Sequence, residues 1–493
     1  MSIIVVFGGT GDLGRKKLIP DIYNLYVDNK LPPECRILTV GRSRRTQEEY
    51  EESVKDCISK YSRFGFDENV WQGFKKRISY RQFDFNDMDG YTALEAELSE
   101  IEGECKKPLG RLFYLATSHD FFSPIVKRLR DSGMADSKDS FRRLVVEKPF
   151  GRDIESARRL NEEMRSVFAE EDIYRIDHYL GNEMIQNIIS LRFANGIFEP
   201  LWNSNYIDNI QISILEEAGV EGREEYYESS GAIRDMVQNH ILQLVSLVMM
   251  EPPASLSPGD IKKQKLNLIK SIRGVTKGDI DKTVVLGQYN EGFIKGESVK
   301  GYRSEKSVAS DSTTETFAAL KLFVLNSRWD GVPVYVRTGK RLNNKLLNIA
   351  VEFKKPLGVY NPEAFEDSEP VILSIKILPE EKVSLQLNMK QPGRLDKIEP
   401  FTMSFCKKIE QKNKNPETYE RLIYDAIQGD STRYAGWEEI ENAWRIVEPI
   451  LDCGKIQEGN IHFYNAGSSG PEEVEGLIER DGRKWWGAGN PRK

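Results

Sequence analysis

The feature that most constrains the fold is a glycine turn that lies between a short apolar run and an amphipathic segment. Residues 3–7, IIVVF, are wholly apolar and rich in β-branched side chains, which is typical of a strand covered on both faces. GGTGDLG follows at residues 8–14, and a helical pattern of apolar side chains comes next. With Gly9, Gly11 and Gly14 at G-x-G-x-x-G spacing, this order predicts a Rossmann dinucleotide-binding unit.

Glycines at these positions let the backbone approach a pyrophosphate, and the following helix N-terminus offers free N–H groups and a partial positive charge. An ordinary tight turn is the alternative interpretation of the glycines. A phosphate-binding loop of the NTPase type also has the spacing of Gly9 and Gly14. However, Arg15-Lys16 stands where such a loop requires Lys-Ser/Thr, so a kinase or NTPase is disfavoured.

The end of the second expected strand indicates which dinucleotide is bound. Residues 36–40 suit that strand, and the sequence GRSRRT follows at residues 41–46. An NAD site usually has Asp or Glu at this point, where it binds the ribose 2′-hydroxyl. Here three guanidinium groups are available to attract a 2′-phosphate and no carboxylate repels it, which predicts NADP. A solvated basic loop is the alternative.

Further apolar runs continue the pattern of alternating strands and helices. Residues 111–116 and 143–147 suit buried strands of a parallel sheet. The second run leads into Lys148, and a residue at the carboxyl end of such a strand points into the crevice where ligands bind. An ordinary strand end is again the alternative. Together these runs predict a Rossmann coenzyme-binding domain over residues 1–176.

The later part of the chain has a different periodicity. Apolar and polar side chains alternate along residues 210–214, 349–353, 373–377 and 383–387. Such strands predict a large, mainly antiparallel sheet with one covered face. A chain of 493 residues suits two packed domains. We therefore expect a β+α domain for substrate binding, catalysis and oligomerisation over residues 177–493, and a fold class of α/β followed by α+β.

Composition excludes several other classes of protein. No apolar run approaches the ~18 residues that span a bilayer, and the N-terminus lacks the basic region and cleavage site of a signal peptide. The five cysteines are odd in number and have no CxxC pair, which favours a reducing cytoplasm over a disulfide framework or a zinc site. A net charge of −7 disfavours general nucleic-acid binding.

The four histidines of the chain include one candidate base, His240. Residues 231–250 predict a long helix, and His240 falls on its apolar stripe at helical spacing. Residues 173–178 look extended, so Asp177 and its neighbour His178 should point to opposite faces. We therefore expect Asp177 to orient His240. A histidine satisfied within the core is the alternative.

Five motifs resemble those of the glucose-6-phosphate dehydrogenases, and the similarity extends over nearly the whole chain. They are GGTGDL (8–13), EKPFG (147–151), RIDHYLGNEMIQN (175–187), DMVQNH (235–240) and VRTGKRL (336–342). The resemblance implies oxidation of glucose 6-phosphate at C1 to 6-phosphoglucono-1,5-lactone with reduction of NADP, the first step of the oxidative pentose phosphate pathway. It also implies a homodimer or homotetramer built on the large sheet, and no metal.

The resemblance further suggests roles for single residues. His240 resembles the base that removes the C1 hydroxyl proton, and Asp177 resembles the carboxylate that orients it. The matching substrate-binding positions are Lys148, His178, Tyr179, Asn182, Glu216, Asp235, Lys340 and Lys345. The matching coenzyme-binding positions are Gly9, Thr10, Gly11, Asp12, Leu13, Arg44 and Lys148.

One position departs from the family pattern. Asn182 stands where the family motif, RIDHYLGKE, has a phosphate-binding lysine. Asparagine is a favoured helix N-cap, and a helix is expected to start at Glu183, so the change need not harm the fold. Two alternatives to an ordinary dehydrogenase follow from it. The chain could prefer an unphosphorylated aldose, or it could act as a non-catalytic NADP(H)-binding protein.

Overall fold

The computed structural model describes residues 2–136, 139–276, 278–355, 368–393, 398–405, 415–453 and 461–487. The chain divides into two compact units. The first unit comprises Met1–Glu183, Ala254–Lys262 and Ile409–Glu441, and the second comprises Met184–Pro253, Lys263–Lys408 and Asn442–Lys493. The first unit thus includes two later segments that a domain of residues 1–176 does not contain. The boundary between residues 176 and 177 stays a prediction.

The first unit is built on a seven-stranded sheet in the order β17-β6-β5-β4-β1-β2-β3. Strands β1 to β6 are parallel, and β17 pairs antiparallel with β6. The bounds are β1 Ser2–Phe7, β2 Arg36–Gly41, β3 Ile78–Gln82, β4 Gly110–Leu115, β5 Arg142–Val146, β6 Ile173–Ile176 and β17 Tyr434–Ala435. This is the strand order of a Rossmann fold, which confirms the predicted class of the first domain.

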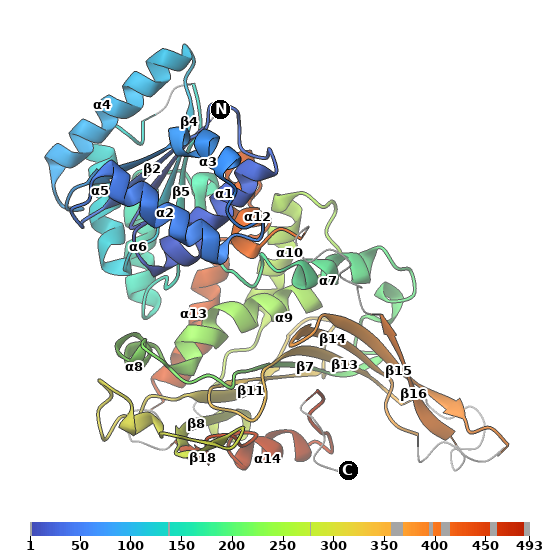
Figure 1. Ribbon diagram of the computed structural model, residues 1–493. Coiled ribbons are helices and arrows are strands. Elements are labelled where there is room, and N and C mark those ends of the chain that lie inside the picture. Colours follow the sequence, from blue (N-terminus) through green and yellow to red (C-terminus); the bar gives the residue numbers. More distant parts are fainter. Residues whose placement is uncertain are drawn as a thin grey trace. The chain divides into compact units, whose positions relative to one another are not determined.

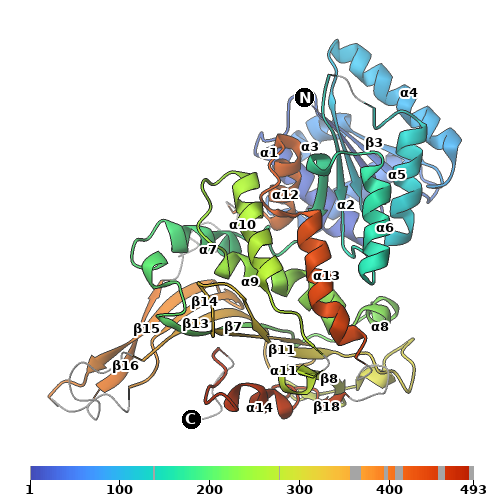
Figure 2. The same cartoon turned by 180° about the vertical axis from the view of Figure 1, so that it is seen from behind.

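Helices cover both faces of this sheet (Figures 1 and 2). One layer comprises α1 (Ile19–Val27), α2 (Gln47–Tyr61), α3 (Glu68–Phe74) and α12 (Thr418–Gln428). The other comprises α4 (Met88–Cys105), α5 (Phe122–Asp131) and α6 (Ile154–Arg165). Ile4 and Val6 of β1 pack into the first layer, which explains why β1 is apolar on both faces.

The second unit contains a nine-stranded sheet in the order β16-β15-β14-β13-β7-β12-β11-β8-β18. Most neighbours are antiparallel, whereas β7–β12 and β8–β18 are parallel, so the predicted mainly antiparallel sheet is confirmed. The bounds are β7 Ile207–Leu215, β8 Val284–Asn290, β11 Phe317–Phe323, β12 Pro333–Gly339, β13 Leu346–Phe353, β14 Ile372–Leu378, β15 Lys382–Lys390, β16 Ile398–Phe405 and β18 His462–Asn465. A separate hairpin joins β9 (Gly292–Ile294) and β10 (Glu297–Val299).

Helices lie against the nine-stranded sheet on both faces, with α9 and α14 on opposite sides (Figures 1 and 2). The prediction of a single covered face is therefore wrong for the central strands, since β7 and β12 are buried along nearly their whole length. The helices are α7 Glu183–Phe193, α8 Glu224–Ala232, α9 Leu242–Met249, α11 Ile280–Thr283 and α14 Glu473–Glu479, while α10 Pro258–Ser271 and α13 Trp437–Leu451 contain residues of both units. Among the described residues, no helix combines the length and the hydropathy that a membrane crossing requires.

The helix predicted over residues 231–250 differs from the expectation in its first half. Gly231 has φ 64°, and the chain from Ile233 to Ile241 is π-helical before it continues as α9. The spacing of 3.6 residues per turn therefore does not apply at His240, and the predicted apolar stripe had the wrong period. His240 is nevertheless completely buried, because nearly every side chain of the π-helical segment is enclosed.

Candidate functional site

The glycine turn has the close packing that a coenzyme-binding turn requires. A Cβ atom on Gly14 would lie 2.1 Å from the Gly9 carbonyl oxygen, and one on Gly9 would lie 2.7 Å from Thr39 Cγ2. Gly8 has φ +83°, and its carbonyl accepts from the Gly11 amide at 2.9 Å. A larger residue at Gly14 would push the start of the following helix away from the turn, and one at Gly9 would collide with Thr39 of β2. Close packing thus explains why glycines stand at these positions in the expected strand–turn–helix arrangement.

The arginines after β2 have different surroundings. The Arg42 guanidinium lies 4.8 Å from the centroid of the Phe121 ring, and Arg45 is half-buried. Arg44 is exposed on the same loop. Thr46 ends the loop and caps α2, with its hydroxyl accepting from the Glu49 amide. Arg44 is therefore accessible beyond the end of β2, and its contact with a coenzyme stays a prediction.

Lys148 and Asp177 follow neighbouring parallel strands of the first unit. Lys148 comes two residues after β5 ends, and its peptide bond to Pro149 is cis. Asp177 comes directly after β6, which pairs with β5 through Val146 and Arg175. The carboxyl ends of parallel strands share one edge of a sheet, and ligands bind at that edge in open α/β sheets. The two side chains thus start from the same edge.

Glu147 is a feature of this edge that sequence reasoning missed. Burial raises the pKa of the Glu147 carboxyl to about 7, although the hydroxyls of Tyr114 and Tyr419 hydrogen-bond to it. The Tyr114 hydroxyl donates to Oε1 at 2.6 Å. Lys148 favours the ionised carboxylate, whereas Asp177 opposes it. The only available signal was the position of Glu147 within EKPFG, since neither tyrosine is near it in sequence.

The structure corrects the expected path of residues 173–178. The strand ends at Ile176, and the chain then turns. Asp177 Oδ1 accepts from the Tyr179 amide at 2.9 Å, and the Asp177 carbonyl accepts from the Leu180 amide at 3.0 Å. Strand alternation therefore cannot separate Asp177 from His178, because neither lies in a strand. The rings of His178 and Tyr179 are adjacent, with centroids 4.8 Å apart.

Asn182 lies between this turn and α7, which begins at Glu183 as predicted. Its amide donates to the Tyr179 carbonyl at 3.0 Å. Arg421 of α12 contacts the residues on both sides, donating to the Gly181 carbonyl at 3.3 Å and pairing with Glu183 at 3.0 Å. A positive charge thus already lies beside the loop that lacks the family lysine.

The second unit holds the remaining candidate residues. Lys340, directly after β12, is buried and forms an ion pair with Glu216, directly after β7. Asp235 lies near the start of the π-helical segment and accepts from the Tyr226 hydroxyl at 3.1 Å. Lys345 is exposed and directly precedes β13. The structure thus brings Glu216 and Lys340 together and puts Asp235 and His240 on one helical segment.

The proposed partners Asp177 and His240 belong to different units. Their pairing stays a prediction, as do the roles of all the candidate residues.

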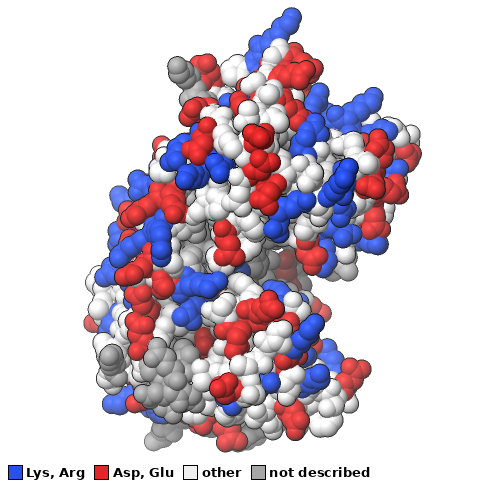
Figure 3. Space-filling model, turned by 90° about the vertical axis from the view of Figure 1, so that its left-hand side faces the viewer, with Lys and Arg blue, Asp and Glu red and all other residues white. Residues whose placement is uncertain are grey.

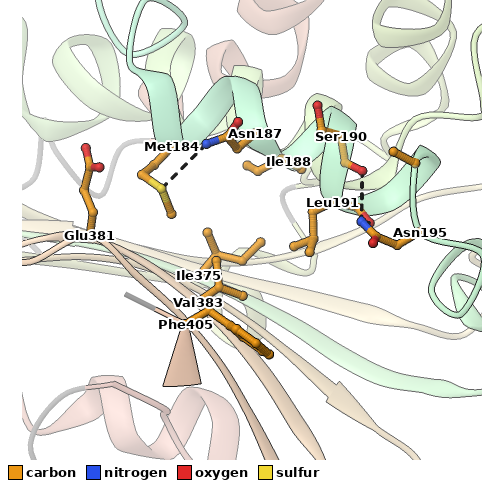
Figure 4. Close-up of a pocket in the computed structure, with 11 residues that line it drawn as sticks. Met184, Asn187, Ile188, Ser190, Leu191, Asn195, Ile375, Glu381, Val383 and Phe405 are labelled. Carbon is orange, nitrogen blue, oxygen red and sulfur yellow. Dashed lines mark hydrogen bonds between the residues drawn. The ribbon is translucent and has the colours of Figure 1, made fainter. Parts of the chain in front are cut away.

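Each unit also has a pocket away from the candidate residues. In the second unit, α7 and strands β14 to β16 enclose about 440 Å³, with mostly apolar side chains such as Ile188, Leu191 and Val383 facing inward (Figure 4). In the first unit, α5 and α6 border a polar pocket of about 550 Å³. None of the predicted site residues lines either pocket.

Basic and acidic side chains are interspersed on the face seen in Figure 3.

Comparison with known families covers almost the entire chain. Residues 5–187 match the family model described as glucose-6-phosphate dehydrogenase, NAD binding domain. Residues 189–486 match the model described as glucose-6-phosphate dehydrogenase, C-terminal domain. The border between the two matches falls close to Glu183, where the first segment of the first unit ends.

Individual relatives are similar over their full length. A glucose-6-phosphate 1-dehydrogenase of Bacillus subtilis is 42% identical over 486 residues, covering 98% of each chain. One from Chlamydia pneumoniae is 40% identical, covering 98% of this chain and 95% of the relative. A solved glucose-6-phosphate dehydrogenase in complex with its substrate glucose-6-phosphate superposes with a TM-score of 0.89, at 31% identity and 98% coverage of both chains.

Proposed function

Because the chain belongs to the glucose-6-phosphate dehydrogenase family, we propose that it oxidises glucose 6-phosphate at C1 and reduces NADP. The observation that carries this proposal is the full-length match to relatives of that activity, at 42% identity and with the fold of an enzyme solved with glucose-6-phosphate. The Rossmann strand order and the packed glycine turn support the coenzyme half of the reaction.

The proposed reaction removes two hydrogens, one from the C1 hydroxyl and one from C1 itself. The hydroxyl proton passes to the imidazole of His240, and NADP, when bound, would supply the acceptor for the hydride from C1. The C1–O bond thereby becomes the carbonyl of 6-phosphoglucono-1,5-lactone. Asp177 orients the imidazole and stabilises its charged form, as carboxylates do beside catalytic histidines. The complete burial of His240 supports this assignment, because a buried base keeps a fixed orientation.

The remaining polar residues are proposed to hold the sugar. His178 and Tyr179 bind the phosphate, with Asn182 in place of the family lysine. Glu216 and Asp235 accept from the sugar hydroxyls, Lys340 and Lys345 are further substrate lysines, and Lys148 corresponds to the family lysine between sugar and coenzyme. The ion pair of Lys340 with Glu216 supports this arrangement, because it holds a donor and an acceptor in place before the substrate arrives.

The activity is tested by following formation of the reduced coenzyme with glucose 6-phosphate or glucose, and with NADP or NAD. Steady turnover with glucose 6-phosphate and NADP is expected. Because Asn182 replaces the family lysine, two alternative functions are also tested, and the same assay distinguishes them. Turnover with glucose alone would indicate an unphosphorylated aldose as the substrate. Coenzyme binding without turnover on either sugar would indicate a non-catalytic NADP(H)-binding protein.

We expect Arg44→Ala to weaken binding of NADP much more than binding of NAD. Loss of a charge-assisted contact to the 2′-phosphate is worth roughly 1.5–3 kcal/mol, or about 10- to 150-fold in affinity. Arg45→Ala is the matched control, because it removes the same charge from a half-buried neighbour on the same loop. Titration calorimetry with NADP and with NAD gives, for each coenzyme, the ratio of the dissociation constants of the variant and the parent protein. Equal losses for NADP and NAD in Arg44→Ala would show that Arg44 does not read the 2′-phosphate.

We infer that a second copy of the chain covers the free end of the large sheet. Phe401, Met403 and Phe405 lie on one face of β16 and are 47%, 41% and 65% exposed. Leu385 and Leu387 of β15 pair with Met403 and Phe401 and continue the apolar face. Exposed contiguous apolar surface of this kind marks interaction sites, and an uncovered edge strand invites pairing. A homodimer or homotetramer is therefore proposed.

We expect Phe401→Asp to reduce the molar mass in solution to that of a monomer, because a charge in a buried apolar interface has no partner. Thr402→Asp is the matched control, since Thr402 points to the opposite face of the same strand. Light scattering after gel filtration measures the molar mass of both variants. An oligomer that survives Phe401→Asp, or is lost equally in the control, uses a different surface.

We also propose a cytoplasmic location. Cys35, Cys57, Cys105 and Cys453 are free thiols in the part of the chain that the structure describes. Free thiols are typical of reducing compartments.

A further inference from the structure

Glu315 is a buried carboxylate that the proposed mechanism does not use. It precedes β11, and the residue is only 1% exposed. Its Oε1 accepts from the Ile233 amide at 3.0 Å, and its carbonyl accepts from the Ala232 amide at 3.0 Å. These two amides stand at the start of the π-helical segment, where no earlier turn supplies acceptors. Glu315 thus caps this helix from more than 80 residues away.

The chain at Gly231 is shaped around this carboxylate. Gly231 has φ 64°, a conformation that side chains rarely adopt. A Cβ atom at this position would also lie 2.4 Å from Glu315 Oε1. The backbone therefore approaches the carboxylate as closely as a glycine permits, which fixes the direction in which the helix leaves. Asp235 and His240 lie three and eight positions into that helix, counted from Ile233.

Thr316, the residue after Glu315, contacts Lys340 directly after β12. The Thr316 carbonyl accepts from the Lys340 amide at 3.0 Å, and the Thr316 hydroxyl bonds to the Tyr464 hydroxyl at 3.0 Å. Tyr464 in turn donates to the Lys340 carbonyl at 2.7 Å. Lys340 pairs with Glu216. Residues 315–316 are thus hydrogen-bonded both to the helix of His240 and to the Lys340 backbone.

We propose that Glu315 is a positioning residue, which fixes the helix bearing Asp235 and His240 relative to the Lys340–Glu216 pair. This inference rests on the proposed function. An ionised group at a helix start also interacts favourably with the helix dipole. The charged and titratable groups that face the carboxylate are Arg234 of the same helix, Tyr227 of α8 and Tyr302.

The pKa of Glu315 indicates that this arrangement does not maximise stability. Burial raises the pKa of the carboxyl to about 6, above its ordinary value of 4.5. A carboxyl with a raised pKa in the folded state contributes stability in its protonated form, and this contribution is lost as the pH rises through 6. At neutral pH the ionised group therefore costs stability. Retention of a costly charge is expected where it serves geometry needed for function.

The test compares Glu315→Ala and Glu315→Gln with a matched control, Glu228→Ala. Glu228 is a half-buried glutamate of α8 whose carboxylate accepts from the Tyr302 hydroxyl at 2.7 Å, whereas the amides of Ala232 and Ile233 donate to Glu315. For Glu315→Ala we expect kcat with glucose 6-phosphate to fall roughly 10- to 100-fold, because a buried bond to a charged group is lost. The KM for NADP should change little. Glu315→Gln keeps an acceptor oxygen, so its kcat should be close to that of the parent protein. Its thermal unfolding midpoint at pH 7 should be equal to or above that of the parent, because the costly charge is removed.

Amide hydrogen exchange provides a readout that does not depend on catalysis. Exchange of peptides covering residues 231–241 should accelerate in Glu315→Ala and stay unchanged in Glu228→Ala. Unchanged exchange in Glu315→Ala, or equal losses of kcat in the two alanine variants, would overturn the proposal. Absence of turnover in the parent protein would instead refute the proposed function, and the exchange measurement would still decide whether Glu315 holds the helix.

Discussion

Replacement of His240 by asparagine is expected to lower kcat on the order of 10²- to 10⁴-fold, with little change in the KM for glucose 6-phosphate. The proton leaves the C1 hydroxyl only as the hydride departs, so the base acts in the transition state and contributes little to substrate binding. Asparagine retains a polar side chain of similar reach within the buried helix but cannot accept the proton. Steady-state kinetics with both substrates varied separates kcat from KM.

Two companion variants make this result specific. Asp177→Asn should lower kcat by a similar or smaller factor, because it leaves the imidazole without the carboxylate that orients it. His178→Asn should mainly raise the KM for glucose 6-phosphate, as expected for a phosphate ligand. Unchanged thermal unfolding and NADP affinity in His240→Asn would exclude a folding defect. Near-normal turnover in His240→Asn would show that another group removes the proton.

Restoring the family lysine, Asn182→Lys, is expected to raise the affinity for glucose 6-phosphate by about 5- to 150-fold, which corresponds to roughly 1–3 kcal/mol. A neutral amide can donate a hydrogen bond to the phosphate, but it brings no full charge and its side chain is shorter than that of lysine. Because the phosphate is remote from C1, much of the gain should appear in KM. Part should appear in kcat, since remote binding energy also positions the reacting carbon.

The comparison with glucose decides whether this gain comes from the phosphate. Oxidation of glucose should be almost unchanged in Asn182→Lys, so the ratio of kcat/KM for the two sugars should rise. Asn195→Lys is a matched control, because it adds the same charge at an exposed asparagine beyond the end of α7. If Asn182→Lys gains nothing, other residues hold the phosphate. Arg421, which contacts both neighbours of Asn182, is then the first residue to test.

Local patterns predicted most of the fold. Each of these patterns depends on a short stretch of sequence. The apolar run at residues 3–7 is confirmed as β1 of the parallel sheet, and the alternating segments are confirmed as β7, β13, β14 and β15 of the large sheet. The glycine spacing is confirmed as the turn that follows β1. The motif predicted a close backbone approach at Gly14, and the packing of this residue against the Gly9 carbonyl gives the physical reason for the glycine.

Features that depend on distant residues could not be predicted in the same way. The π-helical form of residues 233–241 breaks the 3.6-residue period, and its cap comes from Glu315. The end of β6 at Ile176 depends on a turn that Asp177 forms with the Tyr179 amide, whereas the local pattern favoured extension to residue 178. Glu147 depends on Tyr114 and Tyr419, which lie far from it in sequence. For the π-helical segment and for Glu147, long-range contacts outweighed the local preference, whereas the end of β6 depends on a local turn that the pattern of side chains did not reveal.

The position of α12 and β17 in the first unit has a consequence for biosynthesis. Leu422, Ile423 and Ala426 of α12 belong to the same apolar core as α1, and Asn24 of α1 donates to Glu420 at 2.9 Å. The edge strand β17 then completes the parallel sheet beside β6. A ribosome that has made only the first 183 residues has therefore produced an unfinished unit with part of its core uncovered. Closure must wait until residue 435 has emerged, about 250 residues after Glu183, and the nascent chain needs protection from aggregation throughout that interval.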